Sequence, residues 1–137
     1  MTIEEGRMVI LKAIGNTSMV RLRKVVPPDC ADVFVKLEWE NPTGSMKDRM
    51  AQAVISQAER DGRLRSGDTV IEYTGGSTGA SLALVCAAKG YPIHIVSSDA
   101  FSRDKLDQMA AVAIGRGRGH TGKMFGQRVH QIGCDGP

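Results

Sequence analysis

Residues 41–49, Asn-Pro-Thr-Gly-Ser-Met-Lys-Asp-Arg, place a lysine where a turn is expected to become a helix. Lys47 follows small and hydroxyl residues and precedes an acidic and a basic residue. Burial and the positive end of a helix dipole both favour the uncharged form of an amine. An uncharged amine is the nucleophile that attacks carbonyl groups. We therefore predict that Lys47 is catalytic, against the ordinary alternative of a solvated lysine after a turn.

A second segment has the composition of an anion-binding loop, and its sequence is Thr74-Gly-Gly-Ser-Thr-Gly79. It lies between an apolar strand pattern and a helical pattern, so the first N–H groups of the helix would lack internal partners. Thr74, Ser77 and Thr78 add hydroxyl groups, and phosphate or carboxylate suits such a nest equally. The alternative is a tight strand-to-helix connection that needs glycine only for its backbone conformation.

The elements that must position these residues alternate between strand and helix. The residue patterns predict strands over 33–37, 69–73 and 92–96, helices over 48–60 and 78–89, and a further helix that begins at Ser102. This order predicts an α/β fold with a mostly parallel sheet. Because ligands bind at the carboxyl ends of strands in such sheets, we expect the Lys47 turn and the Thr74 loop on one rim.

Composition excludes several classes of protein. The chain is 42% hydrophobic and 24% charged, which is ordinary for a globular domain. Its longest wholly apolar run, residues 82–88, is too short to cross a membrane, and residues 1–5 lack the pattern of a signal peptide. Cys30, Cys86 and Cys134 are widely spaced, so we predict free thiols, no metal site and a cytoplasmic location.

The last 23 residues differ from the rest of the chain. Residues 115–137 are rich in glycine and arginine, and their four basic residues and one acidic residue account for the whole net charge of +3. No strand or helix period is evident there. We therefore divide the chain into a body, residues 1–114, and an irregular tail, residues 115–137.

Three segments of the body together resemble the pyridoxal-phosphate enzymes of the cysteine synthase and cystathionine β-synthase group. Residues 14–22, Ile-Gly-Asn-Thr-Ser-Met-Val-Arg-Leu, resemble the family's IGNTPLVRL segment. Residues 36–49 resemble its KLE…NPxxSxKDR segment, which carries the cofactor lysine, and residues 72–79 resemble its TSGNTG loop. The resemblance covers residues 7–114 and implies the N-terminal part of a three-layer fold of the tryptophan synthase β-like type.

The resemblance also implies roles for individual residues. Lys47 would bind pyridoxal phosphate covalently and take the α-proton of an amino-acid substrate. Ser77 would contact the cofactor, and Thr74, Gly75, Ser77 and Thr78 would bind the substrate carboxylate. The implied reaction is β-elimination or β-replacement, in which an O-acetylserine-like substrate and sulfide give cysteine. A homodimer without nucleic-acid or membrane partners is implied as well.

The sequence departs from the family pattern in two ways. Ser77 stands where the family has asparagine, and Gly75 stands where it has serine; a hydroxyl has a shorter reach than an amide. Members of the family are also more than twice as long. We therefore expect that residues from about Val112 onward are out-of-frame readthrough or reflect a truncated gene. Two alternatives stay open: a non-catalytic fragment of the same fold, and a nucleotide- or nucleic-acid-binding module that uses the basic tail.

Overall fold

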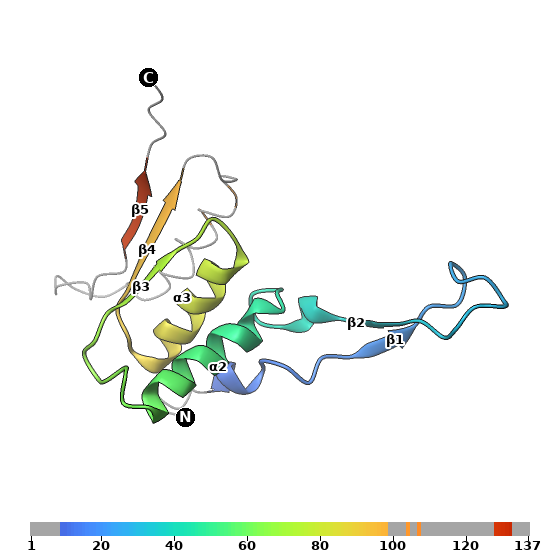
Figure 1. Ribbon diagram of the computed structural model, residues 1–137, viewed down its shortest axis with the longest axis horizontal. Helices are drawn as coiled ribbons and strands as arrows, with labels where there is room; N and C mark the ends of the chain where they lie inside the picture. Colours follow the sequence, from blue (N-terminus) through green and yellow to red (C-terminus); the bar gives the residue numbers. More distant parts are fainter. Residues whose placement is uncertain (1–8, 99–103, 105–106, 108–127, 133–137) are drawn as a thin grey trace, which may run out of the picture.

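The computed structural model describes residues 9–98, residues 104 and 107, and residues 128–132 (Figure 1). It contains an antiparallel ribbon of two strands and a parallel sheet of three strands. The ribbon strands are β1 (Met19–Arg21) and β2 (Phe34–Lys36), and the sheet strands are β3 (Val70–Tyr73), β4 (Ile93–Ser98) and β5 (Arg128–Ile132). Two helices have both ends within the described residues, α2 (Lys47–Arg60) and α3 (Ser77–Lys89), and a single 3-10 turn, η1 (Glu38–Glu40), precedes α2. Residues 9–12 are helical as well.

The β3–α3–β4 segment is the strand–helix–strand unit that positions the predicted anion loop. Its three elements agree with the predicted ranges to within two residues at each end. The strands are parallel, with Val70 opposite Ile93 and Tyr73 opposite Val96. Helix α3 stops at Gly90, whose φ of +86° ends the helix without the steric cost that a side chain would add. The predicted α/β fold is confirmed in this unit.

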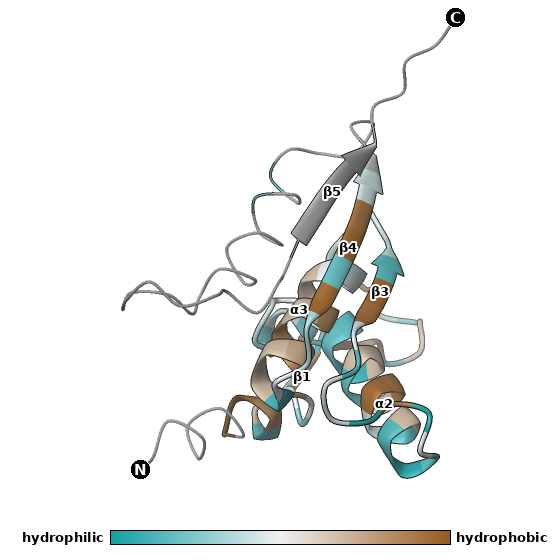
Figure 2. Ribbon diagram, turned by 90° about the vertical axis from the view of Figure 1, so that its left-hand side faces the viewer, coloured by the Kyte–Doolittle hydropathy of each residue, from teal (hydrophilic) through white to brown (hydrophobic). Residues whose placement is uncertain are grey.

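The core lies between α2, α3 and one face of the sheet. Small residues line the contact between the helices: Ala51 of α2 and Ala80 and Ala83 of α3 are at most 1% exposed. On β4, Ile93 and Ile95 are each 1% exposed and complete this core. Figure 2 shows the apolar residues of β3 and β4 beside the two helices. Burial of these apolar side chains is the main force that holds the body together.

Helix α2 begins one residue before the predicted range of 48–60, but its buried face differs from the predicted stripe. Ala51 and Ile55 are buried as expected, whereas Met50 and Val54 are 36% and 52% exposed. The inward position at the start of the helix belongs instead to Asp48, which is fully buried. Helix α3 therefore covers a narrower strip of α2 than the apolar pattern indicated.

The strand predicted over 33–37 does form, but not in the parallel sheet. As β2 it pairs antiparallel with β1, with Met19 opposite Lys36 and Arg21 opposite Phe34. Residues 22–33 join the two strands, and the ribbon extends away from the body in Figure 1. The expectation that the Lys47 turn and the Thr74 loop follow strands of one sheet is therefore wrong. The physical reason is local, because β2 has an antiparallel partner close in sequence.

The structure also differs from the expectation that no strand follows Ile114. Residues 128–132 form β5, which pairs in parallel with β4 from His94–Arg128 to Ser98–Ile132. This segment has only two apolar residues, and its backbone pairs with the edge that β4 leaves free. The rest of the predicted tail and the helix predicted from Ser102 lie outside the described residues, apart from the single positions 104 and 107.

The described residues form only part of the expected three-layer fold, because helices cover one face of the sheet. Helix α3 packs on β3 and β4, and α2 packs on α3. On the opposite face of β3, Ile71 and Tyr73 are 68% and 63% exposed. Among the described residues, no helix is long and apolar enough to span a membrane.

Candidate active site

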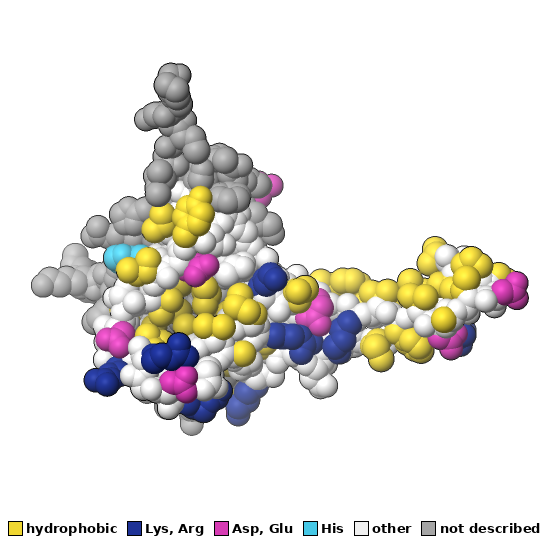
Figure 3. Space-filling model, in the orientation of Figure 1, with side chains coloured by type: hydrophobic (Ala, Val, Ile, Leu, Met, Phe, Trp, Pro, Cys, Tyr) yellow, Lys and Arg dark blue, Asp and Glu magenta, His cyan; other side chains and the backbone are white. Residues whose placement is uncertain are grey.

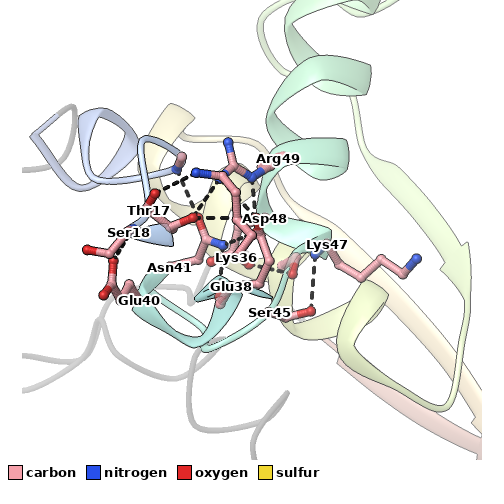
Figure 4. Close-up of polar contacts among 12 residues, drawn as sticks. Thr17, Ser18, Lys36, Glu38, Glu40, Asn41, Ser45, Lys47, Asp48 and Arg49 are labelled. Carbon is pink, nitrogen blue, oxygen red and sulfur yellow. Dashed lines mark hydrogen bonds and ion pairs between the residues drawn. The ribbon is translucent and has the colours of Figure 1, made fainter. Parts of the chain in front are cut away.

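Lys47 is the first residue of α2, so it lies where the sequence predicted that a turn becomes a helix. The Oγ of Ser45 accepts a hydrogen bond from the Lys47 backbone N–H at 3.1 Å and so stabilises the turn that leads into the helix. The lysine side chain is half-buried and points away from the neighbouring polar cluster (Figure 4). Within the part of the chain that the structure describes, its amine forms no ion pair or hydrogen bond. The Lys47 amine is thus not held by any of the described residues.

Asp48, the next residue, points inward and is fully buried. Its Oδ2 accepts a hydrogen bond from the backbone N–H of Thr43 at 2.8 Å, and its Oδ1 accepts one from the Thr43 hydroxyl. A third hydrogen bond comes from the hydroxyl of Ser81 on α3, which is itself fully buried. Asp48 therefore joins the lysine turn to the first half of α3.

Arg49 connects the lysine turn to the segment of residues 14–22. Its Nε and Nη2 donate to the two carboxylate oxygens of Glu38 at 3.0 and 3.1 Å, and Nη2 also donates to Thr17 Oγ1 at 3.0 Å. The hydrogen bond from Arg49 is the largest cause that lowers the pKa of Glu38 below its ordinary value of 4.5. The same contact raises the pKa of Arg49. The forked ion pair thus orients Arg49 within residues 36–49, and the hydrogen bond to Thr17 joins this segment to residues 14–22.

Asn41 fixes the other side of the lysine turn. It is 3% exposed, and its Oδ1 accepts a hydrogen bond from the Gly15 backbone N–H at 2.8 Å. Its Nδ2 donates to the backbone oxygen and to a carboxylate oxygen of Glu38 at 2.9 and 2.8 Å. Asn41 and Ser45 thus make these hydrogen bonds within the protein and shape the turn that carries Lys47.

The predicted anion loop leads from β3 into α3. The Thr74 backbone N–H donates to Val96 at 2.9 Å, which anchors the loop to the end of β4. The Thr74 Oγ1 accepts a hydrogen bond from the Gly76 N–H at 3.3 Å, so the hydroxyl proton remains available as a donor. No side chain caps the start of α3, and the space beside Gly76 is open in the described part of the chain. The loop retains the free donors that an anion site requires.

The structure brings the two predicted sites together through α2 and α3 rather than through a shared sheet. Ser77 and Thr78 lie in the first turn of α3, and Ser81 lies one turn further along the same helix. The hydrogen bond between Ser81 and Asp48 therefore places the start of α2 beside the start of α3. Thr74, Gly75, Ser77 and Thr78 are all half-buried at this end of the molecule.

The described residues offer no metal site, and their two cysteines differ in burial. Among the described residues, no three His, Cys, Asp or Glu side chains gather into a group that could hold a metal ion. Cys86 lies in the core, where burial raises the pKa of its thiol to about 12. Cys30 is a free thiol on the surface.

Sequence reasoning missed Asp48, Ser81, Glu38 and Thr17 as parts of this site. Each lies within or beside a segment that had been singled out, but a buried carboxylate is rare and is not expected from an apolar pattern. The spacing of Ser81 four residues after Ser77 was the one available indication that it shares a helix face with the loop.

Comparison with known proteins places the chain in a family. The family described as "Pyridoxal-phosphate dependent enzyme" matches residues 10–114, which is most of the chain. The chain therefore belongs to this family of pyridoxal-phosphate-dependent enzymes. The resemblance inferred from the three sequence segments is confirmed.

Individual relatives are more specific. The chain is 48% identical over 102 residues to a cysteine synthase of Staphylococcus aureus. This alignment covers 74% of this chain and 33% of that protein. It is similar to the solved structure of O-ureido-L-serine synthase, with a TM-score of 0.74, 36% identity, and 90% and 35% of the two chains covered. For O-acetylserine sulfhydrylase isoform 3 of Entamoeba histolytica the TM-score is 0.70 at 40% identity, with 75% and 32% covered.

These similarities confirm the α/β fold of the tryptophan synthase β-like type. The chain spans about a third of the length of the curated relatives it matches.

Proposed function

We propose that this chain carries the cofactor lysine and the substrate-carboxylate loop of a pyridoxal-phosphate-dependent enzyme of the cysteine synthase type. The observation that carries the proposal is the amine of Lys47, which is half-buried at the start of α2 and uncommitted to other described residues. The proposed reaction replaces the β-substituent of an O-acetylserine-like amino acid with sulfide and gives cysteine. The 48% identity to a cysteine synthase supports this choice of reaction.

The residues present fit the cofactor's aldehyde end. Lys47 offers an amine for the covalent link, and Ser77 offers a hydroxyl for a hydrogen bond at the neighbouring helix start. When bound, pyridoxal phosphate withdraws electrons from the substrate's α-carbon and so makes its proton acidic. The Lys47 amine would accept that proton, and the hydrogen bond from the Lys47 backbone to Ser45 holds the residue in place at the start of α2.

The Thr74–Gly79 loop would orient the substrate. A carboxylate is stabilised by the unpaired N–H groups at the start of α3 and by hydroxyl donors from Thr74, Ser77 and Thr78. Gly75 and the open space at Gly76 allow the carboxylate to approach the backbone. Because the match covers a third of the relatives' length, the proposal concerns these residues and not the turnover rate of this chain.

The proposal extends to partners and location. The substrate is a small amino acid, and the full-length form is a homodimer in the cytoplasm without a nucleic-acid or membrane partner. Two features support this reading: residues 1–114 carry no net charge, and Cys30 and Cys86 are free thiols.

A spectroscopic titration tests the proposal. Addition of pyridoxal phosphate to the wild-type chain is expected to produce the visible absorption band of a lysine adduct, and Lys47→Ala is expected to lose it. Lys24→Ala is the matched control, because Lys24 is exposed on the loop between β1 and β2. An equal band in Lys47→Ala and the wild type would refute the assignment of Lys47.

A further inference from the structure

Asp48 is a buried carboxylate whose hydrogen bonds all come from neutral donors. Three hydrogen bonds from Thr43 and Ser81 compensate for its loss of water, and no Lys or Arg within the described residues forms an ion pair with it. A buried charge of this kind costs free energy unless every acceptor is satisfied. Its place in the first turn of α2 is favourable, because the helix dipole stabilises negative charge there.

Glu59 of α2 and Lys89 of α3 form a polar contact at the far end of the helix pair, but between that end and Asp48 the two helices meet mainly through small apolar groups. Ala51, Ala80 and Ala83 form a smooth surface at the centre of the helix pair, and apolar contacts are not directional. The hydrogen bond from Ser81 to Asp48 is directional, and it fixes the rotation and the position of α2 against α3 at the end that carries Lys47. Lys47 precedes Asp48 in the helix, so the two side chains point in different directions. Asp48 points into the protein, and Lys47 points away from the polar cluster around Asp48 and Arg49 (Figure 4).

We propose that Asp48 and Ser81 are positioning residues that set the Lys47 amine relative to the carboxylate loop. Ser81 follows Ser77 by one turn of α3, so the hydrogen bond joins the two helix starts that carry the amine and the loop. The inference rests on the proposed function, in which the Lys47 amine and the Thr74–Gly79 loop act on the same substrate and must lie at a fixed distance from each other. A small error in such a distance lowers the rate of a reaction between positioned groups.

The test measures covalent labelling instead of enzyme activity. The full chain is treated with pyridoxal phosphate and borohydride, and the labelling rates of Lys47, Lys24 and Lys89 are followed by peptide mass. Ser81→Ala removes the hydroxyl at a fully buried position. The matched control is Ser97→Ala, because Ser97 is also fully buried but its hydroxyl has no hydrogen-bond partner among the described residues.

Lys89 distinguishes positioning from general loosening. Its amine is held by Glu59 at 2.6 Å at the opposite end of the helix pair. The proposal predicts that Ser81→Ala slows labelling of Lys47 at least about tenfold relative to Lys24, with Lys89 unchanged. Ser97→Ala is expected to leave all three rates unchanged. Ser81→Cys, which keeps the volume but weakens the donor, is expected to give an intermediate rate and serves if the alanine variant does not fold.

Two outcomes overturn the proposal. If the labelling rate of Lys47 is unchanged in Ser81→Ala, the hydrogen bond between Ser81 and Asp48 does not position the amine. If the labelling rate of Lys89 rises while that of Lys47 falls, the hydrogen bond has only a structural role. If the wild-type chain labels Lys47 no faster than Lys24, the proposed function fails and the positioning role fails with it. Failure of the proposed function is thus seen in the wild-type chain alone, whereas failure of the positioning role is seen only when Ser81→Ala is compared with the wild type.

Discussion

The lysine turn is held by side chains, and Arg49 and Asn41 both join it to the N-terminal segment of residues 14–22. The Arg49 guanidinium contacts Glu38 and Thr17, and the backbone of Gly15 lies against it. Forked ion pairs of this kind fix the orientation of both partners, which a single contact to lysine would not do. At the scale of single residues, the account therefore predicts that changes around Arg49 disturb the turn that presents Lys47.

Gly15 provides the first prediction. Its φ is +88°, and a Cβ added there would lie 2.8 Å from the Nη1 of Arg49. Gly15→Ala is expected to lower the free energy of unfolding by about 1–3 kcal/mol through backbone strain, with a further loss from the displaced guanidinium. Gly62→Ala is the control, because Gly62 has a φ of +69° and open space around it. Equal losses for the two variants in urea unfolding would show that the contact with Arg49 has no role.

The Glu38 carboxylate provides a prediction about pH. Its pKa is lowered, first by the hydrogen bond from Arg49, so Glu38 stabilises the folded state above its ordinary pKa of 4.5. That stabilisation is lost as the pH falls through the lowered pKa. The difference in unfolding free energy between the wild type and Glu38→Gln should therefore shrink as the solution is acidified. In an Arg49→Met background the difference between Glu38 and Glu38→Gln should vary less with pH, because the largest cause of the lowered pKa is gone. A difference that does not change with pH in the wild-type background would contradict the assignment.

At the scale of elements, α2 and α3 are joined by polar contacts at both ends of an apolar seam. The Asp48–Ser81 hydrogen bond lies at one end, and Glu59 accepts hydrogen bonds from Lys89 and Tyr91 at the other. Burial and the hydrogen bond to Glu59 both raise the pKa of the Tyr91 phenol. The pair of helices can therefore act as one rigid support for the lysine turn and the anion loop.

Tyr91→Phe tests the far end of this support. The change removes the 3.0 Å hydrogen bond to Glu59 and leaves the ring in place. We expect a loss of about 1 kcal/mol in the free energy of unfolding, measured with urea. Tyr73→Phe is the matched control, since Tyr73 is 63% exposed on β3 and should contribute little. A similar loss in both variants would mean that the hydrogen bond does not stabilise the helix pair.

The positions of the helices were predictable because their sequences agree with their tertiary setting. Glycine after residue 89 and the apolar spacing of residues 78–89 define α3 without reference to the rest of the chain. The pairing of β1 with β2 was not predictable, since nothing in residues 33–37 states which strand will be the neighbour. Strand β5 was missed for a related reason, because its pairing depends on β4 more than on its own two apolar residues.

The candidate site divides in the same way. Lys47 and the Thr74–Gly79 loop could be found because turn chemistry is local. Asp48 could not be placed in the core by pattern alone, since its burial depends on Thr43 and on Ser81, thirty-three residues away. Contacts that cross between helices are the part of a site that a linear pattern does not contain.

For the whole molecule, the apolar side chains on the surface are as informative as those in the core. Met19, Val25 and Phe34 are more than half exposed in and between the strands of the β1–β2 ribbon, and Ile71 and Tyr73 are exposed on β3. Figure 3 shows hydrophobic side chains along the ribbon and over the body. A two-stranded ribbon is marginally stable in water, so the stability of the described structure resides in α2, α3, β3 and β4.

Site-mapped trapping of the cofactor is the most direct test of the central claim, that Lys47 is the residue to which pyridoxal phosphate binds. The chain is incubated with pyridoxal phosphate, reduced with borohydride and digested, and the modified peptide is identified by mass. The account predicts one major modified residue, Lys47, and no major site in Lys47→Arg. Modification spread evenly over exposed lysines such as Lys12 and Lys24, or no modification at all, would contradict it.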